Sequence, residues 1–195
     1  MAVEEPITAS IVPTPAEEGA AVSDTSADDT AEVLDDLKTV VSHMAPGRRK
    51  KFLAGQRLQT RYLEWELTFN PRLLRKYSPG EVLLVDFGWN VGAEFGGRHW
   101  AVVVEQNDRA AATVMVVPLS SLKPGQTAAD VHRRDAYVGV IEGLNPNKAV
   151  AKVPQMRAVS KIRIVKPRTV EDGPANKITP DQLAIITSKI KELFI

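Results

Sequence analysis

The residues best suited to chemistry lie in a glycine-rich segment, residues 88–99, which ends in Arg98 and His99. Glycine allows a backbone to adopt positive φ and lets a ligand approach closely. A cation and a titratable imidazole at the end of such a loop can hold a phosphate group. The segment contains four glycines: Gly88, Gly92, Gly96 and Gly97.

This loop is flanked by short apolar runs that predict β-strands. Residues 81–87, 100–104 and 114–119 are rich in β-branched side chains and are bounded by turn-forming residues. Further strands are predicted at 137–141, 149–153 and 158–165, with a turn at 144–147. A last helix is predicted to follow Thr179 as N-cap and Pro180 as first helical residue. Its core-facing stripe is Leu183, Ile186, Ile190 and Leu193.

The chain before these strands has a different composition. Residues 1–30 lack aromatic residues and are predicted to be a disordered acidic arm. Helices are predicted at 31–43 and 48–70, separated by Pro46-Gly47. The second begins with a cationic cluster that a helix N-terminus disfavours. That cluster is either a solvated face or a surface for RNA or for the acidic arm. The expected organisation is therefore an arm (1–30), a helical extension (31–77) and a barrel domain (78–195).

Charge and composition limit the classes of function. Residues 1–36 carry ten acidic and no basic residues, whereas the rest has 25 basic against 14 acidic residues. A basic body of this kind favours a polyanionic partner, although acidic tails also serve only for solubility. The chain has no cysteine, no membrane-length apolar run and no metal-ligand spacing, which together favour a cytoplasmic protein without disulfides.

Several segments together carry a resemblance to a known family. They are Gly80-Glu81-Val82 with Val85-Asp86-Phe87, the loop 91–97, the strand 101–104 ending at Gln106-Asn107-Asp108, the segment 116–120, and the signature 155–164 (QMRAVSKIRI). In this order they resemble the PemK/MazF family of toxin endoribonucleases from about Ser78 onward. The resemblance implies a mainly β fold with flanking helices. It would be an SH3-like (MazF/CcdB-type) small antiparallel β-barrel with a C-terminal helix, here with an N-terminal helical extension.

The resemblance also implies an activity, namely cleavage of single-stranded RNA without metal or cofactor through a cyclic phosphate. Such a reaction needs a base, donors that stabilise the phosphorane, and an acid. The family's arginine position holds His99 here, with Arg98 one residue earlier, and its threonine position holds Ser120, with Ser121 as a fallback. Neighbours in a strand point to opposite faces, so Arg98 and His99 share a site only if one lies in the loop.

Other residues are implied as RNA contacts, and partners follow from the family. The predicted contacts are Asn90, Glu94, Gly96, Gly97, Ser121, Lys123 and Arg157, although Glu94 is better suited to ordering the loop and Arg157 could be structural. Trp89 is expected to be an exposed base platform, and Trp100 to pack in the core. Expected partners are single-stranded RNA, an acidic antitoxin and a second copy in a homodimer, with the arm as a shield in cis. The alternative is a non-catalytic barrel that binds nucleic acid or a protein such as gyrase.

Overall fold

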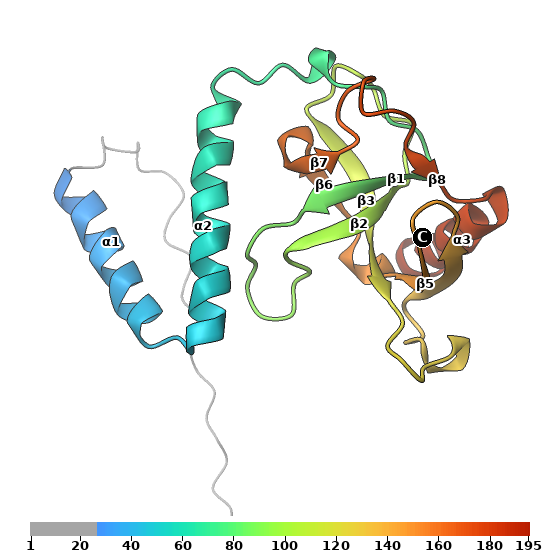
Figure 1. Ribbon diagram of the computed structural model, residues 1–195, viewed down its shortest axis with the longest axis horizontal. Coiled ribbons are helices and arrows are strands. Elements are labelled where there is room, and N and C mark those ends of the chain that lie inside the picture. Colours follow the sequence, from blue (N-terminus) through green and yellow to red (C-terminus); the bar gives the residue numbers. More distant parts are fainter. Residues whose placement is uncertain (1–26) are drawn as a thin grey trace, which may run out of the picture. The chain divides into compact units, whose positions relative to one another are not determined.

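The computed structural model describes residues 27–195, which form two compact units (Figure 1). One unit ends at Arg49, and the second comprises Lys50–Ile195. The described residues contain no helix that is long and apolar enough to cross a membrane.

The first unit contains α1 (Ala27–Ser42) and the first turn of α2 (Pro46–Glu66). The Arg49 guanidinium donates to the carbonyls of Ser42 and Met44, which satisfies groups that a helix end leaves unpaired. The predicted helices are therefore confirmed with shifted ends. Pro46 does not lie in a linker but opens α2, because a proline has no N–H to lose in the first turn. The arm predicted at 1–30 lies almost wholly outside the described residues.

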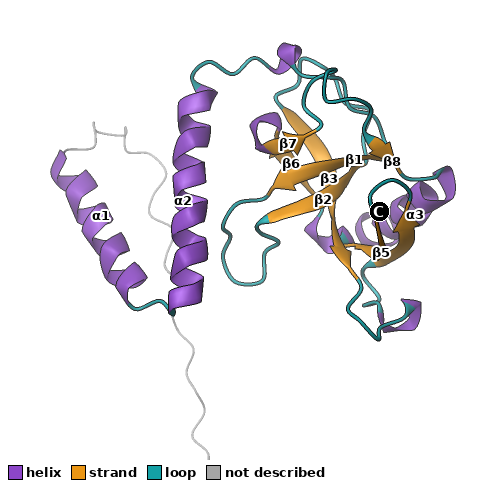
Figure 2. Cartoon of the chain, viewed as in Figure 1, coloured by secondary structure: helices purple, strands orange, loops and turns teal. Residues whose placement is uncertain are grey.

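The second unit is built on one antiparallel sheet, drawn in orange in Figure 2. Its order is β4-β5-β3-β2-β1-β7, with β6 on β3 and β8 on β1. The mainly β fold with flanking helices is as predicted. The strands are β1 (Glu81–Asp86), β2 (Arg98–Val103), β3 (Thr113–Ser121), β4 (Ala136–Ile141), β5 (Asn145–Ala151), β6 (Arg157–Ser160), β7 (Ile164–Lys166) and β8 (Asn176–Lys177).

One predicted turn is wrong in position. Residues 145–147 were expected in a turn because of the Asn-Pro-Asn sequence, but they begin β5. The turn instead comprises residues 142–144, just before β5, and contains Gly143, which has φ +74°. Glycine takes this left-handed conformation without steric cost, so the chain reverses there rather than at the proline.

The two faces of the central strands bury separate cores. Successive residues of a strand point to opposite faces. Accordingly, Val102 joins a core with Val82 and Val117, whereas Val103 joins a second core with Val85 and Val116. The same alternation determines toward which face of the sheet each side chain at the end of these strands points.

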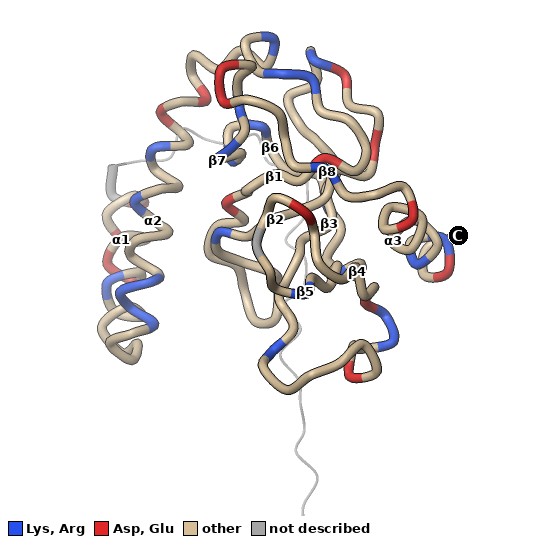
Figure 3. The backbone as a smooth tube through the Cα atoms, turned by 45° about the vertical axis from the view of Figure 1, so that its right-hand side comes forward, with Lys and Arg blue, Asp and Glu red and all other residues tan. Residues whose placement is uncertain are grey.

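Helix α3 (Pro180–Phe194) covers the first core on the side of β4 (Figure 3). Ile186 is fully buried, and the rest of the predicted stripe packs against this core. The Thr179 hydroxyl accepts the Gln182 N–H at 3.2 Å, and the Gln182 side chain accepts the Thr179 N–H at 2.9 Å. This capping box confirms the predicted start of the helix.

From Lys50 onward, α2 lies against the barrel beside the β1–β2 loop. The Phe52 ring meets the Trp89 ring edge-on, with centroids 5.5 Å apart. The α2 glycine, Gly55, leaves room for Trp89, whose Cβ would lie 3.3 Å from an added side chain. The Gln59 side chain accepts a hydrogen bond from Arg163 at 2.8 Å. From Lys50 onward helix α2 is therefore part of this folded body, although its Lys and Arg residues there are exposed. Figure 3 shows in blue where Lys and Arg lie along α2.

Candidate functional site

A cavity of about 210 Å³ opens where β2 and β3 part. The β2–β3 ladder ends at the pair Ala101 and Pro118, and from Leu119 onward β3 pairs with β5 instead. Pro118 has no N–H to donate to a ladder, and its carbonyl accepts the Lys152 N–H at 2.8 Å. The proline thus lies where β3 passes from one neighbour to the other, and the divergence leaves the cavity.

The cavity combines an apolar floor with a polar rim. The apolar residues that line it are Leu84, Trp100, Leu119, Leu144 and Ala149, and the polar ones are Arg98, His99, Ser120, Ser121 and Asn147. Four residues that the sequence singled out therefore lie at one place. Leu144 and Asn147 were predicted only as turn residues, because their position here depends on the long-range pairing of β5 with β3.

Arg98 and His99 both belong to β2, so their side chains leave the strand on opposite faces. Arg98 lies opposite Asp86 and shares its face with Trp100. If the β2–β3 register continued past its last pair, Arg98 would lie opposite Ser121 and His99 opposite Ser120. The strands instead separate here, and all four residues border the gap.

The Arg98 guanidinium is held by a buried carboxylate. Its Nε lies 3.3 Å from Oδ2 of Asp86, which is 5% exposed, whereas the Arg98 side chain is 57% exposed. The second oxygen of Asp86 accepts the Gly88 N–H at 2.8 Å. Because the contact with Asp86 uses Nε, the terminal nitrogens of Arg98 can still bind an anion.

His99 is half-buried beside the aromatic ring of Phe95, with ring centroids 4.4 Å apart. Burial lowers the pKa of His99, and a hydrogen bond to the Gly96 backbone opposes this shift. The imidazole is therefore mainly neutral near pH 7, because its unperturbed pKa is already about 6.5. One ring nitrogen is engaged by the backbone, and the other can accept a proton.

The glycine-rich loop is closed around Phe95 by three side chains. Asn90 donates to the Phe95 carbonyl at 2.7 Å, and Arg157 donates to the same oxygen. The Phe95 N–H donates to the Gln155 side chain at 3.2 Å. The Arg157 guanidinium also lies 5.0 Å from the centre of the Phe87 ring. The predicted RNA contacts Asn90 and Arg157 thus hold the loop that sets the position of His99.

Glu94 lies exposed in this loop, and its charge acts on Arg157, which holds the Phe95 carbonyl. Within residues 27–195, nothing donates a hydrogen bond to its carboxylate. Only glycine fits at position 96, because a Cβ there would lie 2.9 Å from the Gly88 carbonyl oxygen. Gly97 has φ +79° and donates its N–H to that carbonyl at 2.7 Å. These glycines therefore shape the entrance to β2.

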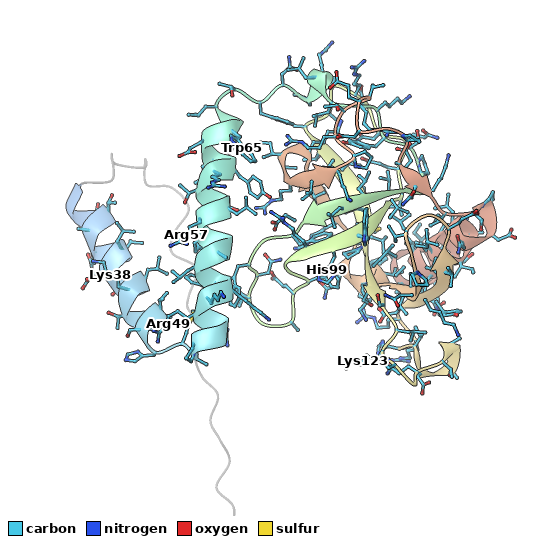
Figure 4. All side chains as sticks on the ribbon, viewed as in Figure 1. Lys38, Arg49, Arg57, Trp65, His99 and Lys123 are labelled. Atoms are coloured by element: carbon cyan, nitrogen blue, oxygen red, sulfur yellow. The ribbon has the colours of Figure 1, made fainter. Side chains whose placement is uncertain are left out.

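Lys123 lies outside the cavity, in the exposed loop that follows β3, and Figure 4 shows it apart from His99. Trp89 is half-buried against Phe52 rather than exposed as expected. Trp100 packs against the first core and also lines the cavity, with Lys166 Nζ 5.4 Å from its ring centre. Of the two tryptophans, Trp100 is thus the one placed at the candidate site.

The sequence model of one protein family matches residues 78–194, which is more than half of the chain. Its description is the PemK-like, MazF-like toxin of type II toxin–antitoxin systems. The chain belongs to this family. All the residues predicted at the site lie within the matched region of this PemK/MazF-like chain, whereas α1 and α2 lie outside it.

Solved structures of such toxins are similar to the PemK/MazF-like chain. MazF from Deinococcus radiodurans is 17% identical, with 61% of this chain and 96% of that chain covered and a TM-score of 0.41. A mycobacterial endoribonuclease in complex with its cognate antitoxin is 15% identical, with 60% and 96% covered and a TM-score of 0.39. No curated protein matches the sequence at a significant level.

Proposed function

We propose that this protein is a toxin-type endoribonuclease that cleaves single-stranded RNA without a metal ion, through a 2′,3′-cyclic phosphate. The observation that carries the proposal is the meeting of Arg98, His99 and Ser120 at one cavity within the family-matched domain. Together they offer a cation, a titratable base and a hydroxyl where two strands part. These are the groups that phosphodiester transesterification requires.

His99 is the general base in this proposal. Its pKa is lowered by burial, so the imidazole is neutral and can take the proton of the ribose 2′-hydroxyl near pH 7. The 2′-oxygen then forms a bond to phosphorus, and the bond from phosphorus to the 5′-oxygen breaks. The leaving 5′-oxygen takes up a proton from water, and the protonated His99 returns its proton to solvent, so the reaction releases no net proton.

Arg98 and the serine hydroxyls stabilise the phosphorane. The terminal nitrogens of Arg98, which are not used in the contact with Asp86, can form two parallel hydrogen bonds to phosphate oxygens. Ser120, with Ser121 beside it, offers a hydroxyl at the opposite border of the gap. Donors fixed in place before the charge develops contribute more than donors that must reorganise.

The size of the cavity favours single-stranded RNA. A space of about 210 Å³ can receive part of one nucleotide, with Trp100 and Leu119 against its apolar face. A base within a duplex would have to leave its stack to enter. Lys123 and the excess of basic residues after position 36 would neutralise flanking phosphates.

We further propose an acidic antitoxin as a partner and a homodimer as the working form. The mycobacterial structure is a complex with its cognate antitoxin, and the family is defined by such systems. Residues 1–36 carry ten acidic and no basic residues, and they can act on the basic surface as an internal counterpart. Deleting residues 1–44 should then raise RNA affinity at low salt, and an unchanged affinity there would contradict shielding by the arm.

The activity is tested with purified protein and a long single-stranded RNA in EDTA. The wild type should produce discrete fragments. Arg98→Ala should lower the rate of cutting by about 100- to 1,000-fold while RNA affinity stays within about tenfold. Arg72→Ala is the matched control, because it removes an exposed arginine that does not line the cavity. RNA bound but never cut by the wild type would favour the non-catalytic binding module.

A further inference from the structure

A buried polar cluster joins α2 to the candidate site. Its centre is the Asp86 carboxylate, which is 5% exposed and accepts hydrogen bonds from Arg98 and Gly88. A buried carboxylate needs such partners to offset the loss of water. Part of this cluster comes from α2, which lies outside the family-matched residues 78–194.

Tyr62 is the α2 residue that reaches the carboxylate. It is 7% exposed, and the Arg163 guanidinium that faces its ring also lies 3.5 Å from the Asp86 carbonyl oxygen, which places the phenol beside Asp86. Burial and the carboxylate together raise the pKa of Tyr62 to about 12. The phenol therefore stays protonated at working pH and can donate to Asp86.

Arg163 fixes the ring of this tyrosine. Its guanidinium lies 5.3 Å from the centre of the Tyr62 ring and donates to Gln59 of α2 at 2.8 Å. Its other terminal nitrogen lies 3.5 Å from the Asp86 carbonyl oxygen. A Cβ at Gly88 would lie 2.9 Å from Arg163, so the glycine makes room for this arrangement. The Tyr62 ring is therefore held beside Asp86 by Arg163.

We propose that Tyr62 is a positioning residue, which holds the Asp86 carboxylate so that Arg98 presents its terminal nitrogens to the scissile phosphate. This inference rests on the proposed ribonuclease function. Arg98 is largely exposed, and its side chain is free to leave the cavity unless Asp86 fixes its Nε. Asp86 in turn keeps its orientation only while its donors surround it. The helical extension would thus complete the site, in addition to covering the barrel.

The test is a pair of matched variants, Tyr62→Phe and Tyr77→Phe. Tyr77 is also buried, also lies under a cation (Lys161, 5.8 Å) and also donates its hydroxyl, to the Pro167 carbonyl at 3.0 Å. It does not line the cavity. Both changes remove one hydroxyl and keep the ring, so each should cost similar stability.

The expected result is a fall of about tenfold in kcat for Tyr62→Phe with KM nearly unchanged, and no comparable fall for Tyr77→Phe. In the Arg98→Ala background, Tyr62→Phe should cause no further loss of the residual rate, because it acts through that arginine. An unchanged kcat, an equal fall in both tyrosine variants, or fully additive losses would overturn the inference. Failure of the wild type to cut RNA would instead overturn the proposed function, and the inference with it.

Discussion

Replacing Arg157 by methionine distinguishes a structural clamp from an RNA contact. The guanidinium donates to the Phe95 carbonyl and lies over the Phe87 ring. Its pKa is lowered by desolvation, which shows that burial works against its charge. Methionine keeps much of the side-chain volume but removes the donor and the charge. We therefore expect a loss of stability together with displacement of the glycine-rich loop.

The magnitude follows from the contacts that are lost. A hydrogen bond from a charged group contributes about 1.5–3 kcal/mol, and a partly exposed cation over a ring adds about 0.5–1 kcal/mol. Regained solvation of the site offsets part of this, and the Phe95 carbonyl keeps its bond from Asn90 at 2.7 Å. A net loss of about 1–2 kcal/mol remains, which lowers Tm by about 2–8 °C in a domain of this size.

The assay combines thermal unfolding with RNA affinity across a salt series, using a 2′-O-methyl RNA that cannot be cut. Arg157→Met should lower Tm and leave the salt dependence unchanged. Lys123→Met is the matched control: it should leave Tm unchanged and reduce the slope of log affinity against log salt by about 0.7, the value for one phosphate contact on a single strand. The reasoning is refuted if Arg157→Met keeps the wild-type Tm and reduces the slope.

Two further predictions concern His99 and the glycine-rich loop. The native pKa of His99 lies below its unfolded value of about 6.5, so the unfolded chain binds more protons and stability should decrease as pH falls below that value. The single-turnover rate should also fall as pH falls, because a protonated His99 cannot act as the base. The stability of His99→Gln should depend less on pH than that of the wild type. An unchanged pH dependence of stability in His99→Gln would contradict this. Gly88→Ala should cost about 1–3 kcal/mol, because φ is +76° and the new Cβ would meet Arg163 at 2.9 Å. Gly92→Ala has φ +60° but open space, so chemical denaturation should show a smaller cost, and equal costs would argue against the contact with Arg163.

The elements that local patterns determine were predictable from the sequence. The β-branched runs predicted β1 to β5, and Thr179 with Pro180 predicted the start of α3, because each signal depends on neighbours in the chain. The single strand expected at 158–165 is instead divided into β6 and β7 by a 3-10 helix, Lys161–Arg163, and β8 was not predicted. Arg98, His99 and Ser120 could be proposed together because they stand at the positions that the family resemblance implied for its arginine and threonine. Whether Arg98 and His99 share a face could not be decided until β2 was known to begin at Arg98.

The remaining features depend on contacts that are distant in sequence. Arg157 binds a carbonyl 62 positions away, so its structural role is invisible in its own segment. Asn147 reaches the cavity only because β5 pairs with β3. Gln59 meets Arg163 across 104 positions, and no periodicity in α2 indicates that contact. Long-range pairing of this kind decides which side chains surround a site, and local propensity does not.

The most direct test of the account is one RNA with a single 2′-deoxy substitution at a mapped cleavage position, incubated with the wild-type protein in EDTA. We predict that cutting stops at that position and continues at unmodified ones, and that every product ends in a 2′,3′-cyclic phosphate. This result is expected because the 2′-oxygen is the attacking group that His99 activates. Cutting at the substituted position, or products with 3′-hydroxyl ends, would contradict the mechanism.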